Sequence, residues 1–463
     1  MVMAMTPVRI IDLVVPLAHE ATAMRTTETT GRRRERSGAV SLLIGIRPSA
    51  GRRSQHDTTL RTLNMPGIRT STTATRTTTT RTTSSAPAPS ANQFARHPHA
   101  DFFFEELVQA YLDCRRTKRN SASALAFEQD LERNLCHLDQ DLRSGGYRPG
   151  RSICFVITRP KPREVWAAEF RDRIVHHLLY NRIAPAIEAR FIADSCACIS
   201  GRGTLYAAQR LESKVRSVTE NWSQSASYLK LDLANFFVSI DKTVLSTLLA
   251  RHVGAGWWLD LANLVLWHDP REDFERRGDP ALLERVPPHK RLALQPEHLG
   301  LPIGNLSSQF FANIYLNELD QFAKHQLGAR HYIRYVDDFV LLHHDVRWLA
   351  EAHRQIRVWL PEHLHAHLND SKTILQPVAR EVGFVGQVIK PWRRELRRRT
   401  FHGALQRIAQ VDEADTLQTI NSYFGLARQA TACRHDRACI ANAARRRGHS
   451  VNGDLTKAHR RAA

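Results

Sequence analysis

The sequence predicts an α+β fold in which a small antiparallel sheet is backed by helices. Residues 331–344 read HYIRYVDDFVLLHH, where two apolar, β-branched runs flank Asp337-Asp338. This pattern is typical of a β-hairpin whose tight turn holds both aspartates. Residues 228–231 also have strand character and end directly at Asp232. The expected sheet therefore carries three carboxylates at the ends of its strands.

Helices with one apolar face are expected before, between and after these strands. Helical spacing is shown by Phe103, Leu107, Ala110, Tyr111 and Cys114, then by Phe127, Leu131, Leu135, Leu138 and Leu142, then by Ile174, Val175, Leu178 and Leu179, and finally by Phe311, Ile314, Tyr315, Leu319 and Phe322. Gly145-Gly146 is expected to end the second helix, and Ser307 or Ser308 to cap the last. Strand-like runs cover 152–158 and 384–389, and a further helix is expected over 401–411.

Composition favours a folded protein that binds polyanions. The chain has 463 residues, a net charge of +20 and 42% hydrophobic residues, enough for two or three domains with their own cores. Seven cysteines without regular spacing argue against a disulfide framework and favour a reducing, cytoplasmic location. Their spacing is also poor for zinc. No run of about 18 apolar residues is present, so no membrane span is expected.

Residues 1–95 differ in composition from the rest of the chain. They contain many Arg and no Lys, and 68–91 consist almost entirely of Thr, Arg, Ser, Ala and Pro. Such a stretch buries too little apolar area to offset chain entropy, so we expect a disordered Arg/Thr-rich extension. Two interpretations stay open: a nucleic-acid-binding arm, or an extension upstream of an alternative start at Met65.

The three carboxylates predict a metal site. Two adjacent ionised carboxylates repel each other, and a divalent cation with hard oxygen ligands removes that penalty. A third carboxylate at the end of a neighbouring strand completes a cage for two metal ions, the arrangement used for in-line phosphoryl transfer. The alternatives are a solvated Asp-Asp turn at 337–338 and a strand-terminal cap at Asp232.

The motifs LDLANFFVSI (231–240) and YVDD (335–338) resemble the two catalytic motifs of reverse transcriptases, and the resemblance extends from about Asp101 to about Arg447. It implies a right-hand polymerase with fingers over 101–225, a palm over 226–378, a helical thumb over 379–447 and a basic tail over 448–463. The implied reaction is RNA-templated DNA synthesis from dNTPs on an RNA-DNA hybrid. Mg2+ is the implied cofactor, as two ions, with Mn2+ as a substitute. The implied metal ligands are Asp232, Leu233, Asp337 and Asp338.

The same resemblance assigns roles to residues around the carboxylates. Lys372 stands where the family has a lysine that can donate a proton to the pyrophosphate. Residues implied to bind the nucleotide are Arg163 and Arg173 at the triphosphate, Phe237 at the ribose, and Ile303 and Gly304 at the base. Residues implied to contact template or hybrid are Arg202, Gln309, Arg397, Arg398 and Arg399. The alternatives are solvated basic faces and, for Phe236 and Phe237, two core aromatics. One of the pair is expected in the core, since adjacent strand residues face opposite ways.

One loop resembles that of a particular group of reverse transcriptases. Most reverse transcriptases have Gln where this chain has Ile303, and the pattern Ile303-Gly304-x-x-x-Ser308-Gln309 resembles diversity-generating retroelements, which copy a template RNA with frequent errors at adenines. This implies an error-prone polymerase for mutagenic retrohoming, with a small basic accessory protein that helps to hold the RNA. Alternatives are a retron-like or phage-defence reverse transcriptase, a group II intron maturase, and a non-catalytic RNA-binding protein with a polymerase fold.

Overall fold

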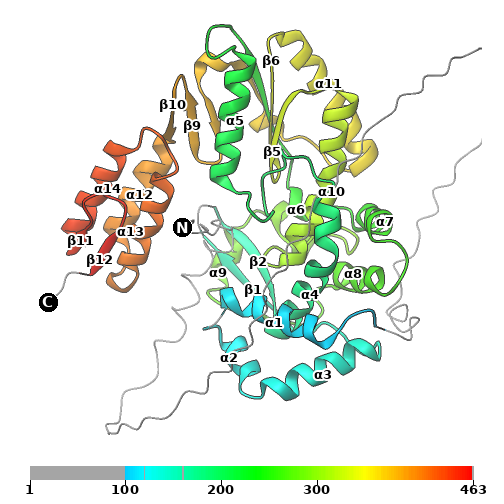
Figure 1. Ribbon diagram of the computed structural model, residues 1–463. Helices are drawn as coiled ribbons and strands as arrows, with labels where there is room; N and C mark the ends of the chain where they lie inside the picture. Colours follow the sequence, from blue (N-terminus) through cyan, green and yellow to red (C-terminus); the bar gives the residue numbers. More distant parts are fainter. Residues whose placement is uncertain (1–99, 119, 159–160, 461–463) are drawn as a thin grey trace, which may run out of the picture. The chain divides into compact units, whose positions relative to one another are not determined.

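The computed structural model describes residues 100–118, 120–158 and 161–460 (Figure 1). The predicted extension over 1–95, with both interpretations of it, lies outside these residues. Within the described ranges, no helix has the length and apolar character needed to cross a membrane. The seven cysteines all lie within these ranges, and none of them forms a disulfide bond.

Four helices build the N-terminal part. Their bounds are α1 (Phe104–Lys118), α2 (Ala122–Glu128), α3 (Leu131–Arg143) and α4 (Phe170–Glu188). The predicted first helix is confirmed, except that Phe103 precedes it and is 76% exposed. The single helix predicted over 127–142 is wrong, because Asp130 leaves the helical conformation (φ −135°, ψ 58°). Asn134 Nδ2 donates to the Phe127 carbonyl at this break.

The first sheet combines a hairpin with a strand from much later in the chain. Its strands are β1 (Ser152–Ile157), β2 (Arg163–Ala168) and β4 (Phe274–Arg276), in the order β2-β1-β4. β1 pairs with β2 antiparallel and with β4 parallel. Arg163, which the resemblance places at the triphosphate, begins β2 and pairs with Ile157.

The second sheet, here called the central sheet, carries the carboxylates. Its antiparallel strands are β3 (Ser227–Asp232), β5 (His331–Tyr335), β6 (Asp338–His343) and β7 (Ile374–Pro377), in the order β5-β6-β3-β7. The predicted β5–β6 hairpin is confirmed, but the expectation that its turn holds both aspartates is wrong. Its two-residue turn is Val336-Asp337, so Asp338 lies in β6 and pairs with Tyr335.

Helices cover both faces of the central sheet. On one face α5 (Thr204–Val218) contacts β5 and β6, and on the other α11 (Val346–Leu364) contacts β3 and β6. Successive strand residues point to opposite faces, so Leu229 and Leu341 belong to the core on the α11 side, whereas Tyr228 and Leu342 belong to the core on the α5 side. The position of each carboxylate along its strand is thereby fixed by burial on both faces.

The segment between β3 and β5 is mainly helical. It contains α6 (Phe236–Ser239), α7 (Lys242–Val253), α8 (Trp257–Trp267), α9 (Ala281–Glu284), α10 (Leu306–Gln321) and a π-helix (Phe322–Gln326). The predicted cap of α10 is wrong: Ser307 and Ser308 lie buried inside the helix, and the N-cap residue is Asn305. The apolar face predicted from Phe311 onward is confirmed as buried.

The C-terminal part contains β8 (Val382–Phe384), β9 (Gln387–Lys390), β10 (Arg393–Leu396), α12 (Arg398–Gln410), α13 (Glu413–Ala427), α14 (Arg434–Arg446), β11 (His449–Val451) and β12 (Ala458–Arg460). The strand predicted over 384–389 is interrupted by a turn at Val385-Gly386. The expected basic tail instead begins with the β11–β12 hairpin. This hairpin packs on the helices because Ala458 is buried and exchanges two hydrogen bonds with Asn421.

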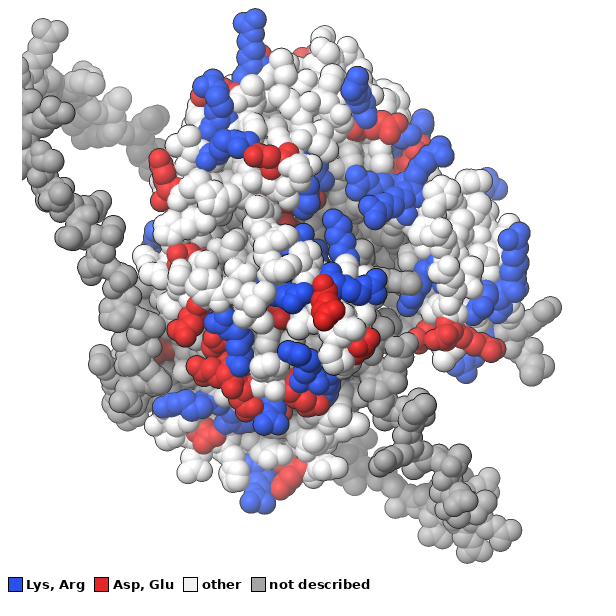
Figure 2. Space-filling view, turned by 180° about the vertical axis from the view of Figure 1, so that it is seen from behind, with Lys and Arg blue, Asp and Glu red and all other residues white. Residues whose placement is uncertain are grey.

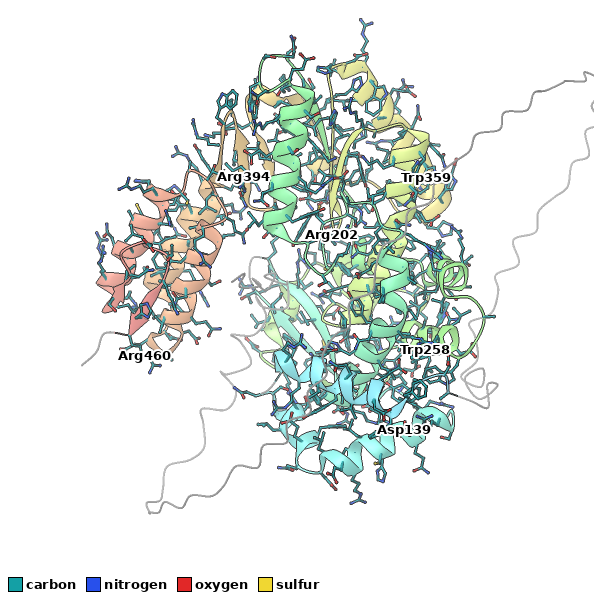
Figure 3. All side chains as sticks on the ribbon, in the orientation of Figure 1. Asp139, Arg202, Trp258, Trp359, Arg394 and Arg460 are labelled. Atoms are coloured by element: carbon teal, nitrogen blue, oxygen red, sulfur yellow. The ribbon has the colours of Figure 1, made fainter. Side chains whose placement is uncertain are left out.

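On the face that Figure 2 shows, the described residues do not form one continuous basic surface. Figure 2 shows Lys and Arg interspersed with Asp and Glu over the face in view. Figure 3 labels Arg394, whose guanidinium is buried between α5 and the β9–β10 strands; its Nε donates to Glu212 (2.7 Å) and its NH1 to Gln387 (2.9 Å). Such arginines hold elements together rather than face solvent.

Candidate active site

Three carboxylates meet at one end of the central sheet. Asp232 ends β3 and is paired in register with Asp338, the first residue of β6. Asp337 occupies the adjoining turn, and its carbonyl accepts a hydrogen bond from the Leu233 N–H (3.2 Å). The two strands therefore bring together residues more than 100 positions apart in the chain.

Two lysines form ion pairs with two of the three carboxylates. Lys372 Nζ lies 2.5 and 2.7 Å from the two oxygens of Asp232, and Lys230 Nζ lies 3.1 Å from Asp338. Lys372 ends a short 3-10 helix (Asp370–Lys372). The preceding Asn369 donates through Nδ2 to Asp232 (3.2 Å) and through its N–H to the Asp232 carbonyl (2.8 Å). The segment after α11 is thus fastened directly to the carboxylate site.

The pKa of Asp337 is shifted above its ordinary value. Burial raises its pKa to about 6, and repulsion from the Asp232 and Asp338 carboxylates contributes in the same direction. Lys372 opposes the shift only weakly. A carboxyl group whose charge is disfavoured by its own neighbours indicates a site arranged for an added cation.

A pH titration of stability without metal tests this interpretation. The native pKa of Asp337 lies above its ordinary value of 3.8, so the native state gains stability from the protonated form at low pH and loses it as pH rises through about 6. In EDTA, Asp337→Asn should therefore be more stable than the wild type at pH 7.5 by about 2 kcal/mol. The difference should shrink toward pH 4. Chemical denaturation at several pH values measures it, and a pH-independent difference would contradict the shift.

The carboxylate oxygens are chemically suited to a divalent cation, but the side chains are not arranged around one common cation position. Over 100–118, 120–158 and 161–460, no three Asp, Glu, His or Cys side chains already converge as ligands. Lys372 and Lys230 instead supply the positive charge at Asp232 and Asp338. Hard carboxylate oxygens on adjacent strand ends are nevertheless the donor set that Mg2+ prefers.

Phe237, predicted at the ribose, lies in the short helix that follows β3. Phe237 follows Asp232 by five residues and is partly buried in α6 against Phe236, with ring centroids 5.4 Å apart. The expectation of two strand residues facing opposite ways is wrong because the pair is helical. The Phe237 carbonyl accepts the N–H of Leu301 (2.8 Å), which attaches α6 to the loop that carries Ile303 and Gly304.

Two hydrogen bonds join the loop that carries Ile303 and Gly304 to β2. The Trp166 N–H donates to the Ile303 carbonyl (2.8 Å), and the Ala168 N–H donates to Asn305 Oδ1 (3.0 Å). Gly304 lies between these bonds with φ +127°, where an added Cβ would approach Val165 Cγ1 to 2.9 Å. Only glycine fits here without displacement.

The predicted basic contacts divide into two groups. Arg163, Arg397, Arg398 and Arg399 are exposed, and Arg397–Arg399 stand at the start of α12. Arg173 and Arg202 are half-buried and already engaged. Arg173 Nε donates to the Ala168 carbonyl (2.6 Å), and burial lowers its pKa.

Arg202 (Figure 3) donates to the carbonyls of Ile192 and Ser195, both at 2.7 Å. These bonds occupy one nitrogen of each guanidinium, so direct phosphate contact by Arg173 or Arg202 would have to use the other nitrogens. Gln309 is half-buried on α10.

Sequence reasoning missed Lys230, Asn369 and Arg334 as parts of the site. A signal existed for two of them: Lys230 and Arg334 are the charged residues inside otherwise apolar strands that lead to Asp232 and Asp337. Buried charges require partners, so each predicts a nearby carboxylate. No local pattern identifies Asn369.

Comparison with known proteins agrees with this geometry. Residues 159–389 match the family model described as "Reverse transcriptase (RNA-dependent DNA polymerase)". The chain contains a reverse transcriptase domain. This domain is an RNA-directed DNA polymerase, a nucleotidyltransferase, and the predicted α+β polymerase fold is confirmed. No curated protein matches the chain.

Two solved telomerase structures are similar to part of this chain. A telomerase from Candida albicans, in complex with a TWJ fragment of telomeric RNA, is 12% identical, covers 64% of this chain and 56% of its own, and has a TM-score of 0.38. An apo telomerase from Candida tropicalis, truncated from its C-terminal domain, is 11% identical over 53% of this chain and 55% of its own, with a TM-score of 0.39. The chain spans little more than half the length of either telomerase.

Proposed function

We propose that this protein synthesises cDNA from dNTPs on an RNA template, using two Mg2+ ions, for which Mn2+ can substitute. The observation that carries the proposal is the register pairing of Asp232 with Asp338 beside the half-buried Asp337. These three side chains, with Leu233, would hold the ions. Bound there, divalent ions lower the pKa of a primer 3′-hydroxyl and neutralise charge on the leaving pyrophosphate.

The surrounding residues have complementary roles in this proposal. The Lys372 ammonium, at hydrogen-bond distance from Asp232, is placed to donate a proton to the pyrophosphate. Arg163 would contact the triphosphate, and Arg397–Arg399 the backbone of the RNA-DNA hybrid. Fingers over 101–225, palm over 226–378 and thumb over 379–447 remain the proposed division. β4 of the palm range nevertheless pairs with β1 of the fingers range.

Phe237 is proposed to exclude ribonucleotides, because a bulky ring beside the nucleotide collides with a 2′-hydroxyl. Phe237→Ala should raise incorporation of rNTPs relative to dNTPs by about 100-fold, the scale of discrimination that one steric contact supplies. Primer extension with each nucleotide class measures the ratio. Phe103→Ala, at an exposed aromatic just before α1, is the control. An unchanged ratio in Phe237→Ala would assign that ring to core packing.

We further propose the error-prone polymerase of a diversity-generating retroelement, acting with a small basic accessory protein and template RNA. The support is the sequence of the loop, Ile303-Gly304-x-x-x-Ser308-Gln309, together with its attachment to β2. Ile303 presents a branched apolar side chain where a glutamine would offer hydrogen bonds. A retron-like or phage-defence enzyme would keep the same carboxylates and copy its template more accurately.

Restoring a polar side chain in this loop tests the fidelity proposal. Ile303→Gln should lower the error frequency at template adenines by about 10-fold, because correct pairing is discriminated by only a few kcal/mol. Sequencing of cDNA made on one defined RNA measures the change, with total yield as the control for activity. An identical error spectrum would remove Ile303 from the mechanism of error.

The polymerase proposal as a whole is tested with purified protein, RNA template, primer, dNTPs and Mg2+. DNA should form in the wild type and in Asp130→Asn, an exposed carboxylate change far from β3, but not in Asp337→Ala or in EDTA. Accurate cDNA would favour the retron-like alternative over the retroelement. RNA binding without any DNA, even with the accessory protein added, would favour a non-catalytic RNA-binding protein.

A further inference from the structure

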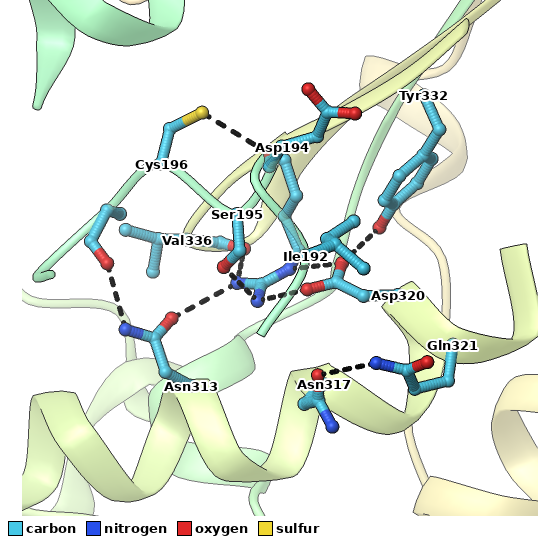
Figure 4. Close-up of polar contacts among 12 residues, drawn as sticks. Ile192, Asp194, Ser195, Cys196, Asn313, Asn317, Asp320, Gln321, Tyr332 and Val336 are labelled. Carbon is cyan, nitrogen blue, oxygen red and sulfur yellow. Dashed lines mark hydrogen bonds and ion pairs between the residues drawn. The ribbon is translucent and has the colours of Figure 1, made fainter. Parts of the chain in front are cut away.

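A fully buried ion pair joins β5, the strand that leads to the Asp337 turn, to α10. Figure 4 labels its carboxylate partner, Asp320. Arg334 on β5 and Asp320 on α10 are each 0% exposed. Arg334 Nε lies 2.8 Å from Asp320 Oδ1, and NH2 lies 2.7 Å from Oδ2, so the contact is bidentate. A buried pair of this kind must recover a large desolvation cost through further hydrogen bonds.

Those further bonds hold the pair from several elements. The Tyr332 hydroxyl donates to Asp320 Oδ1 (2.7 Å), and Arg334 NH2 donates to Ser195 Oγ (2.8 Å). Arg334 NH1 donates to Asn313 Oδ1 (3.3 Å). The backbone of Arg334 is also fixed: its N–H donates to the Asp194 carbonyl (2.9 Å), and its carbonyl accepts the Cys196 N–H (3.0 Å). The guanidinium therefore has little freedom to move.

One N–H of the Arg334 guanidinium reaches the turn that carries Asp337. Arg334 NH1 lies 3.2 Å from the carbonyl of Val336. Val336 has φ +55°, a left-handed conformation that β-branched residues rarely adopt. The next residue is Asp337, whose carbonyl accepts the Leu233 N–H beside Asp232. The strained peptide that places Asp337 is thus restrained by a hydrogen bond from each side.

We propose that Arg334, itself fixed by Asp320, is a positioning residue that holds the Val336 carbonyl and thereby keeps the Asp337 carboxylate next to Asp232. As an effect on the reaction, this rests on the proposed function. A purely structural role would not require a charged pair, since buried ion pairs can often be replaced by apolar residues of similar volume without loss of stability. An apolar replacement cannot reproduce the donors to Ser195, Asn313 and Val336, and of these only the donor to Val336 reaches the turn that carries Asp337.

A variant with apolar side chains in place of the ion pair distinguishes a role in positioning Asp337 from a purely structural role. The triple variant Arg334→Met, Asp320→Leu, Tyr332→Phe removes the charges and the hydroxyl that depends on them. We expect cooperative unfolding and RNA affinity near those of the wild type, with a single-turnover rate lower by about 100-fold, the cost of misplacing a reacting group by about 1 Å. The KM for dNTP should change little, because no nucleotide contact is altered. A wild-type rate in the folded variant would overturn the proposal.

The matched control removes another bidentate pair with the same chemistry. Arg271 binds Asp269 through Nε and NH2 (2.7 and 2.5 Å) and also donates to backbone carbonyls, away from the turn. Arg271→Met with Asp269→Leu should keep the wild-type rate. An equal loss of rate in the control would mean that removal of any such pair disturbs the enzyme, which would also overturn the proposal.

A second route remains if the triple variant does not fold. Arg334→Lys keeps a charge on Asp320 but cannot also reach Val336, so the rate should again fall. Val336→Gly added to it should recover at least about 10-fold of the rate, because glycine takes a positive φ without steric cost. Absence of recovery would show that the Val336 conformation is not what Arg334 controls.

A readout independent of DNA synthesis distinguishes this proposal from the proposed function. Hydrogen exchange of the Leu233 amide in metal-free protein should rise by about 10-fold in the apolar variant, since its acceptor is the Asp337 carbonyl. If the wild type makes no DNA but this exchange rises, the polymerase proposal fails and the positioning role stands. If the wild type makes DNA and the exchange is unchanged, the positioning role fails alone.

Discussion

Asp232→Asn should lower the rate of DNA synthesis by about 10³-fold or more, the largest effect that we expect from a single substitution. Asp232 is buried at the end of β3, paired in register with Asp338 and adjacent to Asp337. Asparagine keeps the size of the side chain but removes a negative charge from the proposed metal ligands. It also leaves Lys372 without the carboxylate that it contacts at 2.5 Å.

Single-turnover primer extension measures this loss, and the unfolding midpoint shows whether the variant still folds. Asp130→Asn serves again as the exposed carboxylate control, with an expected wild-type rate. If Asp232→Asn folds and extends the primer at a tenth of the wild-type rate or faster, the three-carboxylate site is not where the chemistry occurs.

Gly304→Ala should produce the second largest effect, on stability and on nucleotide use together. The new Cβ would lie 2.9 Å from Val165 Cγ1 and 3.1 Å from the Trp166 carbonyl, at φ +127°. The loop can escape only by moving away from β2, which breaks the bond between Trp166 and Ile303. We expect a loss of about 3 kcal/mol in the free energy of unfolding, from backbone strain and overpacking combined.

Denaturant unfolding and the KM for dNTP measure the two effects of Gly304→Ala, and the KM should rise as the loop leaves its position. Gly403→Ala is the matched control. Gly403 lies within α12 with open space around the position of a Cβ, so alanine there should stabilise by about 0.5–1 kcal/mol. Equal effects at the two glycines would contradict the close approach of the loop to β2.

Several features of the site could be predicted from local pattern alone. The apolar, β-branched runs placed Asp232 at the end of one strand and Asp337 in a hairpin. The apolar face of α10 followed from its helical spacing. The separation of Asp337 into the turn and Asp338 into β6 was not predicted, because it depends on Val336 adopting a positive φ.

Other features depended on contacts between distant segments. The sequence indicated that Arg173 and Arg202 are basic residues near the site, but only the folded chain brings the carbonyls of Ala168, Ile192 and Ser195 within their reach. A long, flexible cation has no preferred partner until the backbone around it is placed. The parallel pairing of β4 with β1 likewise joins residues more than 100 positions apart, for which no local pattern exists.

The sequence by itself therefore determined which carboxylates form the site, the strands that carry them and the reverse transcriptase resemblance, because these follow from short-range periodicity and contiguous motifs. Only the tertiary structure decided which cations face those carboxylates, that Gly304 must lack a side chain, and that Arg334 reaches the turn before Asp337. Each of these is a distance between segments far apart in the chain, and packing of the whole domain sets that distance.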